Sequence, residues 1–330
     1  YDVLRGIMVG AAMCRGHRVR LVHARGYVPS AIAVCLKRFC GLRFIFDMRG
    51  FFADEKVEAG HWGARSLAYR LAKRWERRFF EQADSIVSLT AEGIAAFSTL
   101  GYRIAAKTPT VVVPTCVDLG RFVPGPKDPA LLAQLGLREA SLVVGCIGHT
   151  GNRYLRDEML RYLAFLCRRL ERATVLLVTR DDHARLTEEV VAAGVPPERL
   201  VLASAPFEAM PAYLRLMDLG VIFRKPQFSK KGWLAVKLGE FLAMGVPVMI
   251  NDRFGDAGTI VHEGRAGVVL SEVTQAAFEA TWDEVQRLLE DPDCPTRCRQ
   301  VAERYFDLTM GGGRYLELYR RLNGVEGPPR

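Results

Sequence analysis

Short apolar runs that alternate with helical segments constrain this 330-residue chain more than any other feature. Apolar runs of this length are typical of buried parallel strands. Strands that alternate with helices predict parallel sheets covered by helices on both faces. We therefore predict an α/β fold with two Rossmann-like doubly wound domains. The expected strands are 19–23, 42–47, 85–89 and 110–113 in the first half, and 142–147, 174–178, 200–202, 219–223, 246–250 and 267–270 in the second.

A stretch rich in Pro and Gly, 114–129, separates the two halves and reads as a linker. We predict a first domain at 1–125, a second at 126–307, and a C-terminal helix at 308–330 that packs back on the first domain. Within the first half, 48–63 is expected to be a glycine-rich loop. The segment 65–82 is expected to be a long basic helix with Leu67, Leu71, Trp75 and Phe79 on one apolar face. About four strands are few for a doubly wound sheet, so we expect the opening strands of the first domain to be missing.

The stretch 218–256 has the order strand, basic loop, helix and strand. Ligands of open α/β sheets bind beyond the carboxyl ends of the strands, and helix N-termini attract phosphate. The loop supplies Arg224, Lys225, Lys230 and Lys231. The helix carries Lys237 and Glu240, which are three residues apart and share one face. A cation beside a carboxylate suits a ligand with a phosphate and a diol; the alternative is a solvated ion pair.

The net charge of +9 lies in the first part of the chain. Residues 1–127 hold 20 Lys and Arg against 10 Asp and Glu, whereas residues 128–330 hold 26 against 27. A basic half favours anionic partners such as phospholipid or a phosphorylated substrate. Nucleic acid is not expected as a partner, because no nucleic-acid motif accompanies the charge.

The eight cysteines lie mostly in apolar stretches and are expected to be reduced core residues. Cys294 and Cys298 are four apart and lack a second ligand pair, so no zinc site is expected. This cysteine usage fits a reducing compartment, so we expect a cytoplasmic protein. A peripheral position on the inner face of the membrane is also compatible with this expectation.

Several segments together resemble the retaining glycosyltransferases of family 4, which have the GT-B fold. The most specific is Lys-Leu-Gly-Glu-Phe-Leu-Ala-Met-Gly-Val-Pro-Val at 237–248, within 228–256. Others are Phe-Asp-Met-Arg-Gly at 46–50, Ala-Asp-Ser-Ile-Val-Ser-Leu-Thr at 83–90, the linker at 114–122, and Gly-His-Thr-Gly-Asn-Arg-Tyr at 148–154. The resemblance implies a nucleotide-sugar site in the second domain and an acceptor site in the first.

On the donor side, the family's Glu-x7-Glu motif ends at Glu240, which the resemblance implies as the partner of the ribose hydroxyls. A carboxylate accepts hydrogen bonds from both hydroxyls of a diol. The first Glu of that motif falls at Gly232, so the usual sugar contact is lost. The remaining donor candidates face the diphosphate or the sugar: Gly148, Gly151, Arg153, Arg224, Ser229, Lys230 and Lys237.

On the acceptor side, Asp47 ends a strand where relatives place a functional group near the transferred sugar. Arg49 lies two residues after Asp47. The alternative to a functional role is that Asp47 and Arg49 form an ion pair that stabilises the loop. Asp47, Arg49 and Lys231 are our catalytic candidates. We expect His23, Arg25 and Glu55 to line the acceptor side. The alternative for His23 is a structural histidine in the core, and the alternative for Glu55 is a surface charge without a role in binding.

The resemblance implies transfer of a sugar, with retention, from a UDP- or GDP-linked donor to a glycan or lipid-linked acceptor in cell-envelope or other glycoconjugate (polysaccharide) synthesis. Lys and Arg would neutralise the leaving diphosphate, and no cofactor or metal is expected. The basic part of the helix at 65–78 is a candidate for contact with an anionic membrane surface. The alternative is that its basic face is simply exposed to solvent. The alternatives are a non-catalytic nucleotide-sugar-binding or scaffold protein and a nucleotide-sugar epimerase, which share the fold.

Overall fold

The computed structural model describes residues 2–139, 141–151 and 153–324, which form two compact units. The first unit takes in the chain up to Pro114, the segment Gln227–Leu234, and the chain from Thr309 onward. The second comprises Thr115–Pro226 and Ala235–Leu308. The division differs from the sequence-based boundaries in one major respect, because eight residues of the basic loop belong to the first unit. The predicted α/β class is confirmed.

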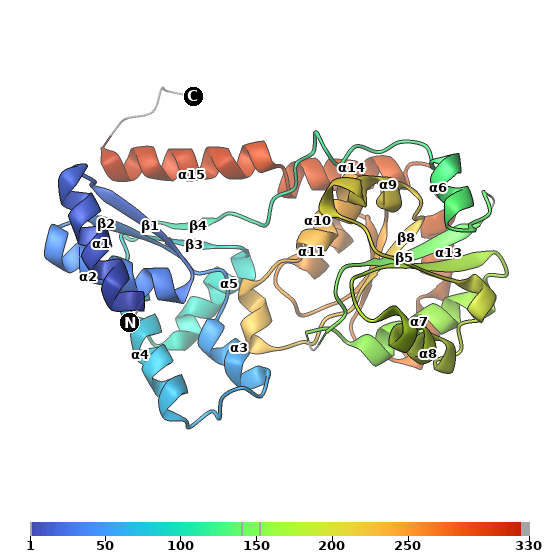
Figure 1. Ribbon diagram of the computed structural model, residues 1–330, viewed down its shortest axis with the longest axis horizontal. Helices are drawn as coiled ribbons and strands as arrows, with labels where there is room; N and C mark the ends of the chain where they lie inside the picture. Colours follow the sequence, from blue (N-terminus) through green and yellow to red (C-terminus); the bar gives the residue numbers. More distant parts are fainter. Residues whose placement is uncertain (1, 140, 152, 325–330) are drawn as a thin grey trace. The chain divides into compact units, whose positions relative to one another are not determined.

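The first unit is built on a four-stranded parallel sheet in the order β1-β2-β3-β4. Helices α2 and α4 contact one face of the sheet, and α15 covers the other (Figure 1). The bounds are α1 Asp2–Gly16, β1 Leu21–Arg25, α2 Tyr27–Cys40, β2 Arg43–Asp47, α3 Phe52–Glu58, α4 Leu67–Gln82, β3 Ser85–Ser88, α5 Ala91–Ala95, β4 Thr110–Val112 and α15 Leu308–Asn323.

Alternation along β2 explains how the sheet is covered on both faces. Successive side chains of a strand point to opposite faces. Phe44 and Phe46 therefore pack with Phe79 and Phe80 of α4. Ile45, between them, packs with Leu318 of α15 on the opposite face. All six side chains are buried, and burial of each such side chain contributes about 1.5–3 kcal/mol.

Two predictions for the first unit are wrong in detail. The predicted glycine-rich loop at 48–63 contains helix α3, in a run without glycine whose first turn carries Asp54 and Glu55. Acidic side chains stabilise the first turn of a helix through its dipole. In α4, Leu67 and Leu71 were expected on the apolar face, but they are 78% and 54% exposed.

The second unit is built on a six-stranded parallel sheet in the order β10-β9-β8-β5-β6-β7. Helices α7, α8, α12 and α13 supply the core on one face, whereas α10 and α11 contact β9 and α14 packs on α10. The bounds are α6 Pro129–Gln134, β5 Leu142–Ile147, α7 Arg156–Arg169, β6 Ala173–Val178, α8 His183–Ala192, β7 Leu200–Ala203, α9 Met210–Arg215, β8 Leu219–Ile222, α10 Val236–Ala243, β9 Val248–Asn251, α11 Ala257–Glu263, β10 Gly267–Leu270, α12 Gln275–Ala280, α13 Trp282–Glu290 and α14 Cys294–Tyr305.

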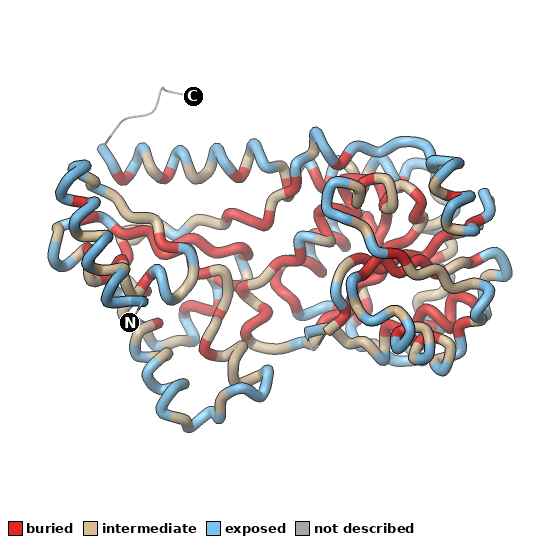
Figure 2. The backbone as a smooth tube through the Cα atoms, viewed as in Figure 1, coloured by how far each residue is buried: buried red, intermediate tan, exposed pale blue. Residues whose placement is uncertain are grey.

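Burial follows the strands in both units, whereas α15 is exposed along much of its length (Figure 2). Gly245 lies just after α10 with φ +75°, the left-handed conformation that favours glycine after the end of a helix. Among the described helices, none is long and apolar enough to cross a membrane.

Candidate functional site

The donor-side candidates of the second unit gather at the carboxyl ends of β5 and β8 and on α10. Gly148 directly follows β5, and Arg224 is the second residue after β8. Lys237 and Glu240 lie on α10, which begins where the chain returns to this unit. Because all strands of the sheet are parallel, these ends share one edge, which is the edge that binds ligands in folds of this kind.

Arg224 is held rigidly by Asn251 at the end of the neighbouring strand β9. The Arg224 backbone N–H donates to Asn251 Oδ1 at 2.6 Å, and Asn251 Nδ2 donates back to the Arg224 carbonyl at 2.9 Å. The Arg224 residue is 2% exposed, which is rare for a cation of this size. Asn251 was not a sequence candidate, although a polar residue that ends an apolar strand is a recognisable signal.

The ring of Tyr154 lies close to two of the predicted donor-side cations. The Arg224 guanidinium carbon is 4.3 Å from the ring centroid, and Lys237 Nζ is 4.4 Å from it. Cations within about 6 Å of an aromatic face are attracted by its quadrupole, by about 0.5–2 kcal/mol. Tyr154 thus holds two positive charges near each other, an arrangement that suits an anionic ligand. The sequence reasoning quoted this tyrosine but gave it no role.

Gly148 allows Lys237 to reach this place. Its φ of +70° disfavours other residues, and a Cβ there would lie 3.0 Å from Lys237 Cε. The Lys237 ammonium donates to the carbonyl of His149 at 3.2 Å. Lys237 therefore lies against the loop that follows β5, and Gly148 is needed for its backbone conformation and for its small size.

Glu240 lies one helical turn after Lys237 on α10 and is 8% exposed. Burial raises the pKa of this carboxyl to about 7, against the opposing effect of the Lys237 ammonium. The group therefore keeps its proton to a higher pH than an ordinary carboxyl does. A diol that donates to the carboxylate would favour the ionised form.

The loop after β5 is tied to the loop after β6 through Asp181. Asp181 accepts hydrogen bonds from the Thr150 backbone N–H at 3.0 Å and from its hydroxyl at 2.7 Å, and it pairs with His149. Although burial works to raise it, these hydrogen bonds hold the pKa of Asp181 at about 2. A Cβ at Gly151 would lie 2.4 Å from His149 Nε2. Arg153 is exposed, and Asn152 of the quoted motif lies outside the described residues.

Three donor-loop candidates, Ser229, Lys230 and Lys231, belong to the first unit and contact α3 and the start of α5. The Ser229 backbone N–H donates to Glu58 Oε1 at 3.0 Å, and its hydroxyl donates to the same carboxylate. Lys230 is buried and lies 3.9 Å from Glu55 Oε1. The Lys231 carbonyl accepts from the Thr90 hydroxyl. The structure therefore gives Ser229 and Lys230 partners on α3, and Glu55 is one of them.

Gly232 is closely packed against the loop that follows β2. A Cβ on Gly232 would lie 3.1 Å from Met48 Cε, 3.2 Å from the Gly50 Cα and 3.3 Å from Phe51. A Cβ on Gly93, in turn, would lie 2.9 Å from the Gly232 Cα. A side chain at this position, such as the family's Glu, would therefore require these neighbours to shift by a few tenths of an ångström.

The acceptor-side candidates His23 and Arg25 meet Asp47 at the carboxyl ends of β1 and β2. His23 Nε2 lies 3.4 Å and Arg25 Nε 3.9 Å from Asp47 Oδ2. The same oxygen accepts from the Tyr315 hydroxyl at 2.9 Å. Asp47 is 1% exposed, beneath α15, so it is a buried and restrained carboxylate.

Arg49, the third candidate at this strand end, has φ +56° and a half-buried side chain. Left-handed backbone is uncommon for arginine and is often found where a loop is functionally constrained. Tyr319, on the same helix as Tyr315, hydrogen-bonds His23 Nδ1 at 2.7 Å. The two tyrosines come from the end of the chain, and no local pattern links them to Asp47. Within 2–139, 141–151 and 153–324, no group of three or more His, Cys, Asp or Glu side chains is arranged to hold a metal.

Comparisons with known proteins agree with this architecture. Residues 3–116 match the family described as "Glycosyl transferase 4-like domain". The chain is 25% identical over 289 residues to the D-inositol 3-phosphate glycosyltransferase of Segniliparus rotundus, which covers 85% of this chain and 61% of that relative's length.

Solved structures with this fold include a sucrose-phosphate synthase from Thermosynechococcus elongatus (TM-score 0.73, 16% identity, 97% of this chain and 78% of that one). Anabaena HepE in complex with UDP gives a TM-score of 0.75 at 16% identity, over 96% of this chain and 82% of that one. A glycosyltransferase from Rickettsia africae gives 0.76 at 13% identity, over 98% and 82%.

The two parallel sheets and these neighbours define a GT-B fold. The match of residues 3–116 to a glycosyl transferase 4-like domain and the 25% identity to a glycosyltransferase agree with the family resemblance of the sequence motifs.

Proposed function

We propose that this protein transfers a sugar, with retention, from a nucleotide-sugar donor to a hydroxyl of a glycan or lipid-linked acceptor. The observation that carries the proposal is the group at the carboxyl edge of the second sheet. There, Arg224 and Lys237 lie at the ring of Tyr154, and Glu240 lies one turn along α10. Two cations match a diphosphate, and a buried carboxylate matches the two ribose hydroxyls.

UDP is the donor nucleotide that we favour. Anabaena HepE, which shares the fold, has been solved with UDP and with UDP-glucose. In this chain, Arg224 and Lys237 would neutralise the charge that develops on the leaving diphosphate, which is the stabilisation that lowers the barrier most in such reactions. A leaving phosphate oxygen would take the proton of the attacking hydroxyl, so the proposal requires neither a metal nor another cofactor.

Asp47 is proposed to orient the acceptor in the first unit, with Arg49 and Lys231 as further catalytic candidates. His23, Arg25 and Tyr315 surround Asp47 Oδ2 at distances of 2.9 to 3.9 Å. Such contacts hold one carboxylate oxygen in place. The second oxygen, Oδ1, is buried and has no hydrogen-bond partner among the described residues.

The test is thermal unfolding with UDP, GDP, ADP and CDP, on the wild type and on Glu240→Ala. A ligand that binds only the folded state raises stability by about 2.7 kcal/mol at 100 times its Kd. We expect UDP to raise the Tm of the wild type and to lose most of this effect in Glu240→Ala. If none of the four nucleotides raises the wild-type Tm, the proposed donor site is wrong.

A second candidate function is nucleotide-sugar binding without turnover. The observation that favours it is Gly232, where the family's first motif Glu is replaced and the neighbours are closely packed. UDP-glucose and related donors would then bind, but incubation with glycan or lipid-linked acceptors would release no UDP. Release of UDP that depends on an acceptor would exclude this alternative.

We further propose that the protein is cytoplasmic and touches an anionic membrane surface through helix α4, in cell-envelope or other glycoconjugate synthesis. Exposed Leu67 and Leu71 share this helix with exposed Arg70, Arg74 and Arg77. Apolar and basic side chains together are the mark of helices that lie in a membrane interface.

A further inference from the structure

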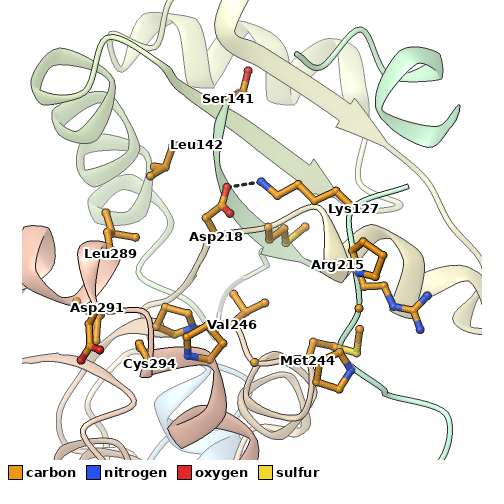
Figure 3. A pocket seen from close by; sticks show the side chains of 18 of the residues that line it. Lys127, Ser141, Leu142, Arg215, Asp218, Met244, Val246, Leu289, Asp291 and Cys294 are labelled. Atoms are coloured by element: carbon orange, nitrogen blue, oxygen red, sulfur yellow. Dashed lines mark hydrogen bonds and ion pairs between the residues drawn. The ribbon is translucent and has the colours of Figure 1, made fainter. Parts of the chain in front are cut away.

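A cavity of about 610 Å³ lies in the second unit at the amino ends of β5, β8 and β9, opposite the edge that carries the donor site (Figure 3). Lys127 crosses one side of it and pairs with Asp218 at 2.6 Å. Met244 and Gly245, at the end of α10, form part of its wall. Cys294, the first residue of α14, also lines it.

Cys294 has a second thiol beside it. Cys298 lies one helical turn along α14, and the two sulfur atoms are 3.9 Å apart. Their hydrogen bond lowers the pKa of Cys294, against the effect of burial and with help from Arg297, whereas the same bond and burial raise the pKa of Cys298. Cys294 is therefore the better nucleophile of the two. Cys294 is 1% exposed, and the cavity that it lines is the side from which we expect a small reagent to approach.

The first turn of α14 is attached to the end of α10. A Cβ at Gly245 would lie 3.2 Å from both Cβ and the carbonyl oxygen of Pro295, so the two backbones are already close. Arg299 NH1 donates to the carbonyl of Ala243 at 2.9 Å, which satisfies a free carbonyl at the end of α10. The turn that holds the two cysteines thus contacts the helix that carries Lys237 and Glu240.

We propose that Cys294 and Cys298 are an oxidisable dithiol whose disulfide displaces the end of α10 and weakens nucleotide binding. The oxidant is a peroxide. The Cys294 thiolate attacks one peroxide oxygen, the O–O bond breaks, and hydroxide leaves, which gives a sulfenic acid. The Cys298 sulfur then attacks the Cys294 sulfur, the S–O bond breaks, and water leaves as the disulfide forms. Peroxide is reduced and the two thiols are oxidised by two electrons.

The disulfide and the helix turn require different spacings. Cβ atoms four residues apart on a helix are about 5–6 Å apart, whereas Cβ atoms joined through a disulfide are about 3.5–4.5 Å apart. Closing the bond therefore pulls the first turn of α14 together by roughly 1–2 Å, and Pro295 lies in that turn. Strained disulfides are the labile, regulatory kind, and transient ones are expected in a reducing compartment.

The first experiment follows the bond itself and does not depend on nucleotide binding. The full chain is exposed to hydrogen peroxide, free thiols are alkylated, and the protein is digested with trypsin. Because trypsin cleaves after Arg297, peptides that hold Cys294 and Cys298 stay joined only if the disulfide has formed. We expect this joined product in the wild type and in Cys146→Ser, and a sulfenic acid trapped by dimedone at Cys294 in Cys298→Ser.

The second experiment measures the link to α10, and this part rests on the proposed donor site. We expect oxidation to weaken UDP binding at least threefold in the wild type and in Cys146→Ser, with recovery after dithiothreitol, and to leave binding by Cys298→Ser unchanged. If Cys294 and Cys298 are alkylated to the same extent with and without peroxide, the two cysteines are not oxidised and the proposed dithiol is wrong. A disulfide that forms without a change in UDP affinity overturns the link to α10. If the reduced protein does not bind UDP, the proposed donor site is wrong, but the disulfide found by peptide analysis is unaffected. The effect of the disulfide on α10 is then measured as a change in amide hydrogen exchange of that helix.

Discussion

The hydroxyl of Tyr315 donates to the carboxylate of Asp47 across 268 positions of the sequence, at 2.9 Å. Burial and the nearby negative charge of Asp47 raise the pKa of Tyr315, so the hydroxyl stays protonated and remains a donor. Helix α15 is thereby fixed to the strand end on which the predicted catalytic carboxylate lies.

Tyr315→Phe is expected to lower the free energy of unfolding by about 1–3 kcal/mol, because a buried carboxylate loses a donor. Urea unfolding measures the loss. Tyr305→Phe is the matched control, since this half-buried tyrosine lies beside Arg304 at the surface, and it should change stability by less than about 0.5 kcal/mol. Equal effects of the two substitutions would contradict the role of the Tyr315–Asp47 bond.

Glu240 gives the fold a pH dependence that runs opposite to that of most carboxylates. Its pKa is about 7 in the folded state and about 4.5 in the unfolded chain, so the folded protein holds the proton more tightly. The stabilisation is therefore full below pH of about 4.5 and is lost as the pH rises through about 7. Over this window the free energy of unfolding should fall, relative to Glu240→Gln, by on the order of 3 kcal/mol.

Urea unfolding of both proteins at pH 5 and pH 7.5 measures this difference. Glu188→Gln, at an exposed position of α8, serves as the control and should follow the wild type at both pH values. If the gap between wild type and Glu240→Gln is the same at both pH values, the raised pKa is wrong.

Binding of a nucleotide sugar should reverse the protonation of Glu240. The ribose hydroxyls donate to the ionised form, so binding below pH of about 7 releases a proton, and UDP-glucose should bind more tightly at pH 8 than at pH 6. UDP-glucose is preferred to UDP here because its diphosphate does not titrate in this range. Calorimetry in two buffers of different ionisation enthalpy counts the protons. Glu240→Gln should release none, and the same proton count in both proteins would refute the contact.

Tyr154→Leu is expected to weaken UDP binding by about threefold to thirtyfold. The ring holds Arg224 and Lys237 at 4.3 and 4.4 Å, and each cation–π contact contributes about 0.5–1 kcal/mol. Tyr154→Phe keeps the ring and should bind UDP as the wild type does. Isothermal titration calorimetry separates these cases, and a Phe variant as weak as the Leu variant would indicate that the hydroxyl, not the ring, matters.

Gly232→Ala is expected to lower the free energy of unfolding by about 1–3 kcal/mol, because the added methyl group meets the Gly50 backbone at 3.2 Å. Gly312→Ala is the matched control, since a Cβ there meets nothing within 4 Å and Ala favours a helix. It should be neutral or stabilising by up to about 1 kcal/mol. A stable Gly232→Glu variant would show that the family's motif residue can be accommodated after all.

For the membrane contact, Leu67→Ser/Leu71→Ser should reduce co-sedimentation with anionic vesicles while leaving stability nearly unchanged, since both side chains are exposed. Lys73→Ala should instead destabilise the fold, because Lys73 pairs with Asp54 at 3.0 Å and with buried Glu76. Vesicle binding by the wild type that does not depend on anionic lipid would remove the basis for this contact.

The sequence predicted strands far better than loops. Buried parallel strands are continuous apolar runs, and β5 and β10 begin and end where expected. Helix α3 was missed because its seven residues have weak periodicity between glycines on either side. Leu67 and Leu71 were misassigned because apolar residues keep their helical spacing along the whole of α4, whereas only the later part of the helix packs against the core.

At the candidate site, the sequence predicted Arg224, Lys237 and Glu240 from one local stretch, 218–256, and Gly148 from the separate motif at 148–154. It gave no role to Tyr154 or to Asn251, whose importance depends on which strands are neighbours. The position of Tyr315 could not be predicted either, since its partner Asp47 is fixed by tertiary packing alone. Ser229 and Lys230 lie in the predicted loop, but that loop folds with α3.

The assignment of Gln227–Leu234 and of the chain from Thr309 onward to the first unit has a consequence for gene construction. The polypeptide passes between the units four times, so no one cut yields two intact halves. A chimera made by exchanging sequence at the linker would inherit an eight-residue segment and a terminal helix from the wrong parent. Recombination among relatives should therefore succeed only when the start of the gene, this short internal segment and the final helix are exchanged as a set.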